Sequence, residues 1–319
     1  MKIAMANVSF TPEQIGALKR LAQQYNSELV SYEAGTRLTA EQLDAYDALM
    51  GYFPPELLGG LPRLRWMQVP SAGVDHLLRG AFDPDRTILT NSSGAFGVVI
   101  GEYLTAGLLM LFRKMPAYLN NQRAHLWQSE GTAKSVYGSL VTVVGLGDIG
   151  GGFAERMHMM GARVRGVKRS ASDRPDFIES IYTVEHLAEA VEGADAVALC
   201  LPATRETRGL LSEEIIRRMK PGAVLLNAGR GSTVDEAALI RALQDGHLGG
   251  AVLDVTEVEP LPADSALWDM GNVVLTPHIS GSNTDPVCIN ATFRIFKDNL
   301  ERFLTGKPLC NIVDIRVGY

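Results

Sequence analysis

The chain has 319 residues, of which 46% are hydrophobic and 21% charged, which is the balance of a folded globular protein. Its length predicts two domains. The net charge of −6, from 30 basic and 36 acidic residues, excludes the electrostatic footprint of a nucleic-acid-binding protein. No stretch reaches the ~20 apolar residues that a membrane span needs, and no polybasic run is present that would bind anionic lipid.

The cysteines and the first residues predict the compartment. Cys200, Cys288 and Cys310 form neither a metal-ligand spacing nor an even set for disulfides, so no metal site is expected. Residues 1–10 contain a short apolar run without a small-residue cleavage site, which is typical of a first β-strand rather than of a signal peptide. Free thiols without an export signal favour a cytoplasmic protein.

Short apolar runs alternate with amphipathic stretches in the first third of the chain. The predicted strands span residues 2–7, 27–33, 48–53, 64–69 and 87–91. Residues 11–25 are predicted as a helix, because Ile15, Leu18, Leu21 and Ala22 share one face behind a threonine cap and a first-turn proline. This alternation predicts a parallel sheet with helices on both faces.

A long apolar helical region follows, from about residue 98 to 115, where Pro116 interrupts it before a second amphipathic stretch to about Trp127. It is more apolar than one solvent-facing helix needs, which predicts a homodimer. The alternative is that the region packs within its own chain.

The strand–helix alternation then restarts and forms a second α/β unit. The predicted strands span 140–144, 163–167, 196–201, 223–227, 250–255 and 273–276. The predicted helices span 149–160, 183–189, 212–219 and 235–244, and one long helix covers 285–304. The sequence alone leaves open on which of the two units this last helix packs.

A glycine-rich loop lies between the first strand and the first helix of the second unit, with Gly145, Gly147 and Gly150 in the pattern G-x-G-x-x-G. In a dinucleotide-binding fold the first glycine makes the tight turn, the second lets a pyrophosphate approach, and the third lets helix and strand pack closely. The N–H groups at the start of the helix then face the phosphates. The strand before and the helix after favour this function over a purely structural turn.

The next strand ends where an NAD site carries an acid for the ribose hydroxyls. Here Lys168, Arg169 and Ser170 follow the strand instead. Cationic groups at this place suit the 2′-phosphate of NADP. The sequence therefore predicts NADP as the preferred cofactor, with NAD as the second choice.

Three ionisable residues, Arg230, Glu259 and His278, follow strands of the second unit. Ligands of open α/β sheets bind outside the carboxyl ends of the strands, so these side chains could meet one substrate. Arginine can hold the oxygens of a keto acid through two N–H groups, and histidine can donate or accept a proton near neutral pH. A neighbouring carboxylate would orient the imidazole and favour its protonated form, and spacing leaves this partner open between Asp254, Glu257 and Glu259.

At these motifs the sequence resembles the D-isomer-specific 2-hydroxyacid dehydrogenases over nearly its whole length. The resemblance includes the glycine loop, residues 201–207, residues 227–236, residues 254–262 and Pro277-His278. In the first unit, residues 71–75 look like the carboxylate-binding loop of the family. Lys168-Arg169 replaces the acid that the family carries after the second strand, an NADP-type feature that the shorter glyoxylate/hydroxypyruvate reductase members share, and this chain resembles those members most.

The resemblance implies two flavodoxin- or Rossmann-like doubly wound α/β domains with the active site in the cleft between them. A discontinuous substrate-binding domain would span residues 1–96 and 286–319, and an NAD(P)-binding domain residues 97–285. His278 would protonate the carbonyl oxygen, Glu259 would be its partner, and Arg230 would orient the substrate. The N–H groups of Gly73 and Val74 would bind the substrate carboxylate.

The resemblance also implies a cofactor site. Its members are Gly145, Gly147, Asp148, Ile149, Gly150, Lys168, Arg169, Ser170, Leu201, Pro202, Thr207, Ala228, Gly229, Arg230, Asp254, His278 and Gly281. One departure from the family is Thr256, which stands where many members have phenylalanine beside the catalytic glutamate.

The function that follows is an oxidoreductase that reduces a 2-keto acid, such as glyoxylate or hydroxypyruvate, to the D-2-hydroxy acid with NAD(P)H. The alternative from another class is a nucleotide-sensing scaffold similar to the C-terminal binding protein corepressors, which share the fold. Oxidation of formate or phosphonate on the same fold stays open. The predicted partners are a small 2-keto or 2-hydroxy acid and a second copy of the chain.

Overall fold

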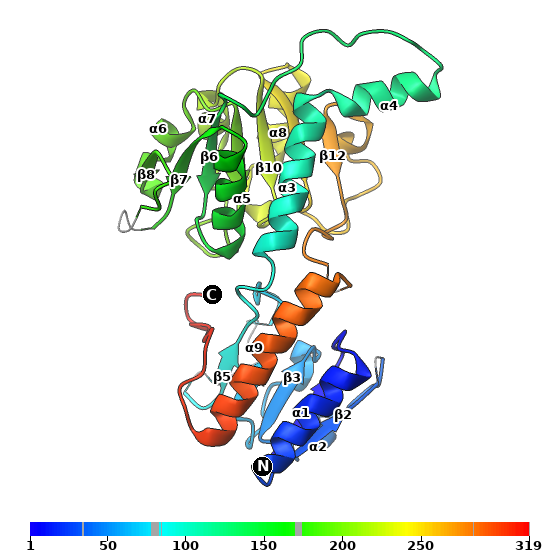
Figure 1. Ribbon diagram of the computed structural model, residues 1–319, viewed down its shortest axis with the longest axis vertical. Helices are drawn as coiled ribbons and strands as arrows, with labels where there is room; N and C mark the ends of the chain where they lie inside the picture. Colours follow the sequence, from blue (N-terminus) through cyan, green and yellow to red (C-terminus); the bar gives the residue numbers. More distant parts are fainter. Residues whose placement is uncertain (34, 78–82, 84, 170–173, 283, 319) are drawn as a thin grey trace. The chain divides into compact units, whose positions relative to one another are not determined.

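The computed structural model describes residues 1–33, 35–77, 83, 85–169, 174–282 and 284–318, and Figure 1 shows their arrangement. The chain divides into two compact units. Unit 1 contains Met1–Phe96 and Ser282–Tyr319, and unit 2 contains Gly97–Gly281. The chain therefore leaves unit 1 after Phe96 and returns to it at Ser282, four residues before the start that the sequence suggested.

Unit 1 is built on a five-stranded sheet in which every neighbouring pair is parallel. Its strands are β1 (Lys2–Ala6), β2 (Glu28–Ser31), β3 (Ala48–Gly51), β4 (Trp66–Gln68) and β5 (Ile88–Thr90). The order β2-β1-β3-β4-β5 is that of flavodoxin-like folds. The central strands are buried on both faces, as expected for a parallel sheet between helices.

Helices cover both faces of this sheet. They are α1 (Pro12–Gln24), α2 (Ala40–Leu43), the 3₁₀ turn η1 (Pro55–Leu57) and α9 (Pro286–Thr305). Helices α1 and α9 lie side by side in Figure 1, and their apolar residues form one core with Ile3, Met5 and Trp66. Helix α9 begins at the cap residue Asp285 and ends at Gly306, which is left-handed.

Unit 2 is built on a seven-stranded sheet, again with parallel neighbours throughout. Its strands are β6 (Leu140–Val144), β7 (Arg163–Val167), β8 (Ser180–Tyr182), β9 (Ala196–Leu199), β10 (Ala223–Asn227), β11 (Leu248–Leu253) and β12 (Val273–Leu275). The order β12-β11-β10-β9-β6-β7-β8 is the Rossmann order with one further strand. The strand order reverses between β6 and β9, and a fold of this kind binds its ligand outside the carboxyl ends at that point.

The helical segments of unit 2 lie between these strands, apart from two that precede the sheet. The α-helices are α3 (Gly97–Phe112), α4 (Met115–Arg123), α5 (Asp148–Met159), α6 (Leu187–Val191), α7 (Glu213–Arg218) and α8 (Glu236–Gln244). The 3₁₀ turns are η2 (Val184–His186), η3 (Gly231–Thr233) and η4 (Ala266–Asp269). None of the helices in the described ranges is long and apolar enough to cross a membrane.

The apolar region after Gly97 differs from the expected single helix interrupted at Pro116. The break comes at Lys114, which is left-handed, and Pro116 lies in the first turn of α4, where its missing N–H has no helical partner to lose. Ile100, Leu104, Leu108 and Phe112 are buried because α3 packs on α5 and on the sheet. The apolar character of α3 is therefore explained within its own unit, whereas α4 and the segment after it extend away from the rest of unit 2 (Figure 1).

Candidate active site

The glycine loop of unit 2 has the geometry that a dinucleotide needs. Gly145 follows β6 with a φ of +95°, a left-handed turn that a residue with a Cβ rarely adopts. A Cβ on Gly150 would lie only 1.8 Å from the carbonyl oxygen of Gly145, so glycine is required for the close packing of α5 on β6. A Cβ on Gly147 would meet no described atom within 4 Å, which leaves open space in front of the helix.

The start of α5 is also electrostatically suited to an anion. Gly147 is the N-cap residue, and no side chain caps the helix there. The first N–H groups of a helix carry partial positive charge and are satisfied by a phosphate where no cap exists. The side chain of Asp148 turns away to accept a hydrogen bond from Gly97 N at 2.8 Å, so only its backbone is available to a phosphate. These features fit a bound pyrophosphate.

The predicted phosphate-binding cations lie next to this loop. Strand β7 pairs with β6 and ends at Val167, and Gly145 N donates to the carbonyl oxygen of Val167 at 2.8 Å. Lys168 N donates to Tyr182 O of β8, which fixes the backbone, and Arg169 is exposed. Ser170 lies outside the described residues.

The loops after β9 and β10 also lie at the carboxyl ends of the strands of this sheet. Thr207 Oγ1 donates to Pro202 O at 2.7 Å and holds the loop that begins at Leu201. Ala228 and Gly229 are buried directly after β10, and Gly281 is half-buried after β12. Each of these expected cofactor residues therefore follows the carboxyl end of a strand in the same sheet.

His278 and Glu259 form a close pair. His278 Nδ1 lies 2.8 Å from Glu259 Oε2, and the other carboxylate oxygen accepts a hydrogen bond from Thr256 N at 3.2 Å. Because Nδ1 is engaged by the carboxylate, Nε2 is the ring atom that can exchange a proton with another molecule. The geometry thus pairs His278 with Glu259 and not with Asp254 or Glu257, the two alternatives that spacing left open.

The backbone at Arg230 is fixed from two sides. Asn227, at the end of β10, donates from Nδ2 to Arg230 O at 3.0 Å and accepts from Gly229 N at 3.1 Å. A Cβ on Gly231 would lie 1.9 Å from Thr256 O, so this loop packs directly on the loop that leads to Glu259. Arg230 and Glu259 are therefore presented by two loops that touch.

His278 itself lies in a tight turn organised by Asp254. The φ of His278 is +54°, a left-handed conformation that costs a non-glycine residue about 1–2 kcal/mol. The carbonyl oxygen of Asp254 accepts a hydrogen bond from His278 N at 2.8 Å. The buried Asp254 carboxylate accepts three more, from Thr276 Oγ1, Ile279 N and Ser280 N. The cofactor contact expected of Asp254 stays a prediction, and its carboxylate is committed to this turn.

The expected carboxylate-binding loop lies in unit 1 after β4. Asn91 Nδ2 donates to Ala72 O at 2.7 Å, and Ser71 Oγ donates to Gly73 O at 2.7 Å. These bonds engage carbonyl oxygens of the loop. Within the described part of the chain nothing accepts a hydrogen bond from the N–H of Gly73 or Val74.

Comparison with known proteins decides the family. A family model described as the NAD binding domain of D-isomer specific 2-hydroxyacid dehydrogenases matches residues 105–280. The chain belongs to the D-isomer-specific 2-hydroxyacid dehydrogenase family. The matched residues include the glycine loop, Arg230, Glu259 and His278.

Two relatives and one solved structure show how far the similarity extends. An (S)-sulfolactate dehydrogenase of Chromohalobacter salexigens is 36% identical over 229 residues, which are 71% of this chain and 74% of the relative. A glyoxylate/hydroxypyruvate reductase B of an Enterobacter strain is 33% identical over 292 residues, or 88% of this chain and 89% of the relative. An NADPH-dependent glyoxylate/hydroxypyruvate reductase of Sinorhizobium meliloti, solved with NADP and sulfate, superposes with a TM-score of 0.84 at 27% identity and covers 100% of both chains.

These findings confirm the predicted family, the two parallel-sheet α/β domains and the class of enzyme. The chain is an NAD(P)-dependent oxidoreductase of the 2-hydroxyacid dehydrogenase class. The corepressor-like scaffold gains no support from them. The described residues contain no group of three or more acidic, histidine or cysteine side chains that could hold a metal ion.

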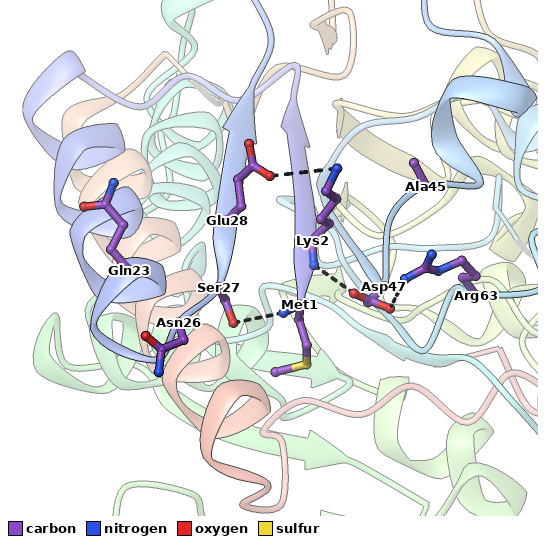
Figure 2. Close-up of a pocket in the computed structure, with 9 residues that line it drawn as sticks. All are labelled: Met1, Lys2, Gln23, Asn26, Ser27, Glu28, Ala45, Asp47 and Arg63. Carbon is purple, nitrogen blue, oxygen red and sulfur yellow. Dashed lines mark hydrogen bonds and ion pairs between the residues drawn. The ribbon is translucent and has the colours of Figure 1, made fainter.

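An open depression of about 620 Å³ lies at the opposite edge of the unit 1 sheet (Figure 2). It is lined by Met1, Lys2, Gln23, Asn26, Ser27, Glu28, Ala45, Asp47 and Arg63. Lys2 N donates to Asp47 Oδ2 at 2.8 Å, and Arg63 pairs with Asp47 at 3.4 Å. These residues precede or begin strands, whereas ligands of such sheets bind at the carboxyl ends. We therefore interpret the charged residues of this depression as stabilising the sheet and not as binding a ligand.

Several residues that organise the site were missed by the sequence argument. They are Asn91, Tyr103, Asn227, Thr256 as a hydrogen-bonding residue, and Thr276. Tyr103 had a visible signal, because it is one of the few residues with a polar group in a helix that is mostly apolar. Thr276 had another, since it directly follows β12 and directly precedes Pro277-His278.

Proposed function

We propose that this chain reduces a small 2-keto acid, such as glyoxylate or hydroxypyruvate, to the D-2-hydroxy acid with NADPH. The single observation that carries the proposal is the pair of His278 and Glu259, 2.8 Å apart, in the sheet that also presents the glycine loop. A proton donor oriented by a carboxylate beside a dinucleotide loop is the equipment of carbonyl reduction. The named relatives that act on glyoxylate and hydroxypyruvate support this substrate class.

Each site residue has one part in the reaction. NADPH, when bound, supplies the hydride that adds to the keto carbon. His278 gives the Nε2 proton to the carbonyl oxygen, and Glu259 holds the ring through Nδ1 and stabilises the imidazolium before transfer. The guanidinium of Arg230 binds the keto and carboxylate oxygens, and the N–H groups of Gly73 and Val74 bind the carboxylate. The keto acid would gain one hydride from the bound cofactor and one proton from His278, so that the D-2-hydroxy acid and NADP⁺ would be the products.

The preference for NADPH rests on charge. Lys168 and Arg169 stand where an NAD enzyme carries an acid, and a 2′-phosphate placed there would find two cations. An acid would repel that phosphate, whereas the ribose hydroxyl of NADH gives the cations little to bind. The solved reductase of Sinorhizobium meliloti, which binds NADP, supports the same preference.

The assembly proposed is a homodimer. Met115 and Leu119 of α4, together with Leu126 and Trp127 after it, are exposed although all four are apolar. A segment of this kind extending from unit 2 would bury its surface against a second copy of the chain. Sedimentation that gives a particle of about twice the chain's 34.5 kDa would support the dimer, and a monomer at micromolar concentration would refute it. The cytoplasmic location stays a prediction.

The reaction is tested by following NADPH oxidation with glyoxylate, hydroxypyruvate or a bulky 2-keto acid and, in the reverse direction, NADP⁺ reduction with sulfolactate. In the His278→Ala variant kcat should fall about 10²–10⁴-fold, which is the usual contribution of a positioned acid, and the affinity for NADPH should remain nearly unchanged. Glu259→Gln should lose less, because the proton donor remains. Turnover of sulfolactate alone would replace glyoxylate and hydroxypyruvate by a sulfonated acid as the substrate, and a His278→Ala enzyme with normal kcat would refute the role of His278 as proton donor.

A further inference from the structure

A chain of hydrogen bonds runs from helix α3 to the turn that carries His278. The hydroxyl of Tyr103 lies 2.7 Å from Thr276 Oγ1, and Thr276 Oγ1 donates to Asp254 Oδ1 at 2.6 Å. Threonine has one hydroxyl proton, and Thr276 gives it to the carboxylate. Tyr103 must therefore be the donor to Thr276.

The same carboxylate holds the residues after His278. Asp254 Oδ1 accepts from Ile279 N at 2.8 Å, and Asp254 Oδ2 accepts from Ser280 N at 3.0 Å. The left-handed backbone of His278 is unfavourable by itself, so it persists only because neighbouring bonds fix both of its sides. Tyr103 is the outermost member of the network that does this.

We propose that Tyr103 is a positioning residue for His278, acting through Thr276 and Asp254. The proposal rests on the proposed role of His278 as proton donor. Hydrogen bonds in a buried chain polarise one another, so a hydroxyl at its end strengthens the bonds that follow. Tyr103 thus keeps Nε2 of His278 where the carbonyl oxygen must receive its proton.

Two properties make Tyr103 suited to this part. Burial raises the pKa of Tyr103 to about 12, so the hydroxyl keeps its proton and remains a donor at every pH at which the enzyme works. Helix α3 has 16 residues and packs on α5, β10 and β11, which fixes the base of the side chain. A rigid donor of constant protonation state supports a turn without responding to pH.

The expected signature is a loss of kcat alone. Tyr103→Phe keeps the ring and its packing and removes only the hydroxyl. We expect kcat for keto acid reduction to fall about three- to ten-fold, the rate equivalent of one net hydrogen bond, with both KM values within two-fold of the wild type. Thr276→Val should lose at least as much, and Thr276→Ser, which keeps the hydroxyl, should restore most of it.

Tyr46→Phe is the matched control. Tyr46 is a buried tyrosine of unit 1 whose hydroxyl lies 2.5 Å from that of Tyr32, so its variant also loses one buried phenol contact. It should lower the melting temperature about as much as Tyr103→Phe does and leave kcat unchanged.

A double-mutant cycle with His278→Ala separates positioning from general structural support. If Tyr103 acts through His278, Tyr103→Phe lowers kcat in the wild type and has no further effect in His278→Ala. The same fold loss in both backgrounds, or a normal kcat for both Tyr103→Phe and Thr276→Val, overturns the proposal. If Tyr103→Phe does not fold, Thr276→Val and Thr276→Ser give the same test. A fully active His278→Ala enzyme would instead overturn the proposed function itself.

Discussion

In each unit the first strand of the sheet is followed by a helix, and the two helices differ in how their first N–H groups are capped. In unit 1, Thr11 caps α1 by accepting from Gln14 N, and the Gln14 side chain accepts from Thr11 N in return. In unit 2, Gly147 takes the cap position of α5 and no side chain caps the helix. Helix α1 therefore satisfies its first N–H groups from within the protein, whereas α5 leaves them for an anion.

At the amino edge of the sheets the two units are alike. Asp47, just before β3, accepts from the first strand at Lys2 N and pairs with Arg63. Asp195, just before β9, accepts from Leu140 N at the start of β6 and pairs with Lys220 at 2.6 Å. Each aspartate thus fastens the first strand of its sheet to a neighbouring strand, as Figure 2 shows for unit 1.

The comparison separates scaffold from function. The aspartate that joins the first strand to its neighbour is present in both units, and we infer that it maintains the sheet. The side-chain cap at the start of the helix that follows the first strand is present in unit 1 and absent from unit 2, and we infer that its absence marks a binding site. By this criterion the depression around Asp47 is structural despite its volume, and the uncapped glycine loop after β6 is functional. The predictions below test this division at both edges, from the largest expected effect to the smallest.

Gly150→Ala should have the largest effect on the glycine loop. Its Cβ would collide with Gly145 O at 1.8 Å, so α5 must move away from β6 and carry its N–H groups with it. We expect NADPH affinity to fall about 100-fold, or ~2.7 kcal/mol, and unfolding stability to fall by about 1–3 kcal/mol.

Gly151→Ala is the control in the next position. A Cβ there lies 3.8 Å from Leu146 O, an ordinary contact, and alanine favours the helix. Calorimetric titration with NADPH and thermal unfolding compare the two variants. Equal NADPH affinities would show that close packing of α5 does not matter for binding.

Gly147→Ala should reduce binding without reducing stability. The backbone at Gly147, with φ −74° and ψ −161°, accepts any residue, and its Cβ would meet open space in the protein. A bound pyrophosphate would occupy that space, so we expect NADPH affinity to fall about 10-fold or more, which is ~1.4 kcal/mol. A melting temperature that drops together with affinity would contradict this reading, because it would mean that the glycine serves the fold.

Removing the two cations should change the choice of cofactor. We expect Lys168→Ala and Arg169→Ala to lower kcat/KM for NADPH about 10-fold, since a hydrogen bond to a charged group contributes about 1.5–3 kcal/mol. The constant for NADH should hardly change, which provides the internal control. Kinetics with NADPH and with NADH in parallel give the ratio of the two kcat/KM values. A ratio equal to that of the wild type would mean that other residues bind the 2′-phosphate.

Thr11→Ala in unit 1 should lower the stability of the fold and leave NADPH binding unchanged. The capping box of α1 would be lost, and we expect about 1 kcal/mol less stability in urea unfolding. NADPH affinity should remain at the wild-type value, because unit 1 satisfies this helix start internally. A Thr11→Ala variant that binds NADPH more weakly would break the proposed division between the two junctions.

The sequence predicts the strands of unit 2 well, because the residue patterns that indicate them are local. Strands β6, β7 and β10 have the predicted bounds, since β6 and β10 are short, mostly apolar runs and β7 begins with alternating polar and apolar residues, all of them bounded by loops. Strand β8 was missed: it has three half-buried residues at the sheet edge, too few for a period to show. The helix predicted over 183–189 is present with other bounds: a 3₁₀ turn covers 184–186, and the α-helix α6 follows at Leu187–Val191.

The site depends on contacts that spacing cannot supply. Asp254, Glu257 and Glu259 are all within reach of His278 in sequence terms, and only the fold shows that Asp254 lies buried beneath the turn. Helix α3 was predicted from its apolar residues, but the hydroxyl of Tyr103 finds Thr276 across 173 residues of sequence. Such pairings are set by tertiary packing and not by local pattern.

Asp195→Asn should give the smallest effect, and one that depends on pH. Burial alone would raise the pKa of Asp195, but the hydrogen bonds from Lys220 and Leu140 N and the charge of Lys134 outweigh it and lower that pKa. A carboxyl with a lowered folded-state pKa stabilises the fold above its unfolded pKa of about 3.9 and loses this contribution as pH falls through the folded value.

We therefore expect Asp195→Asn to be only about 0.5 kcal/mol less stable than the wild type at pH 7, since the ion pair with Lys220 is partly exposed. The difference should shrink in urea unfolding as the pH falls below about 4, because the unfolded carboxyl binds a proton first and the folded carboxyl, whose pKa is lowered, binds one only at lower pH. NADPH affinity should be unaffected, because Asp195 lies at the amino edge of the sheet. A stability difference that stays constant down to pH 3 would mean that Asp195 fastens β6 by its hydrogen bonds alone and that its charge contributes nothing.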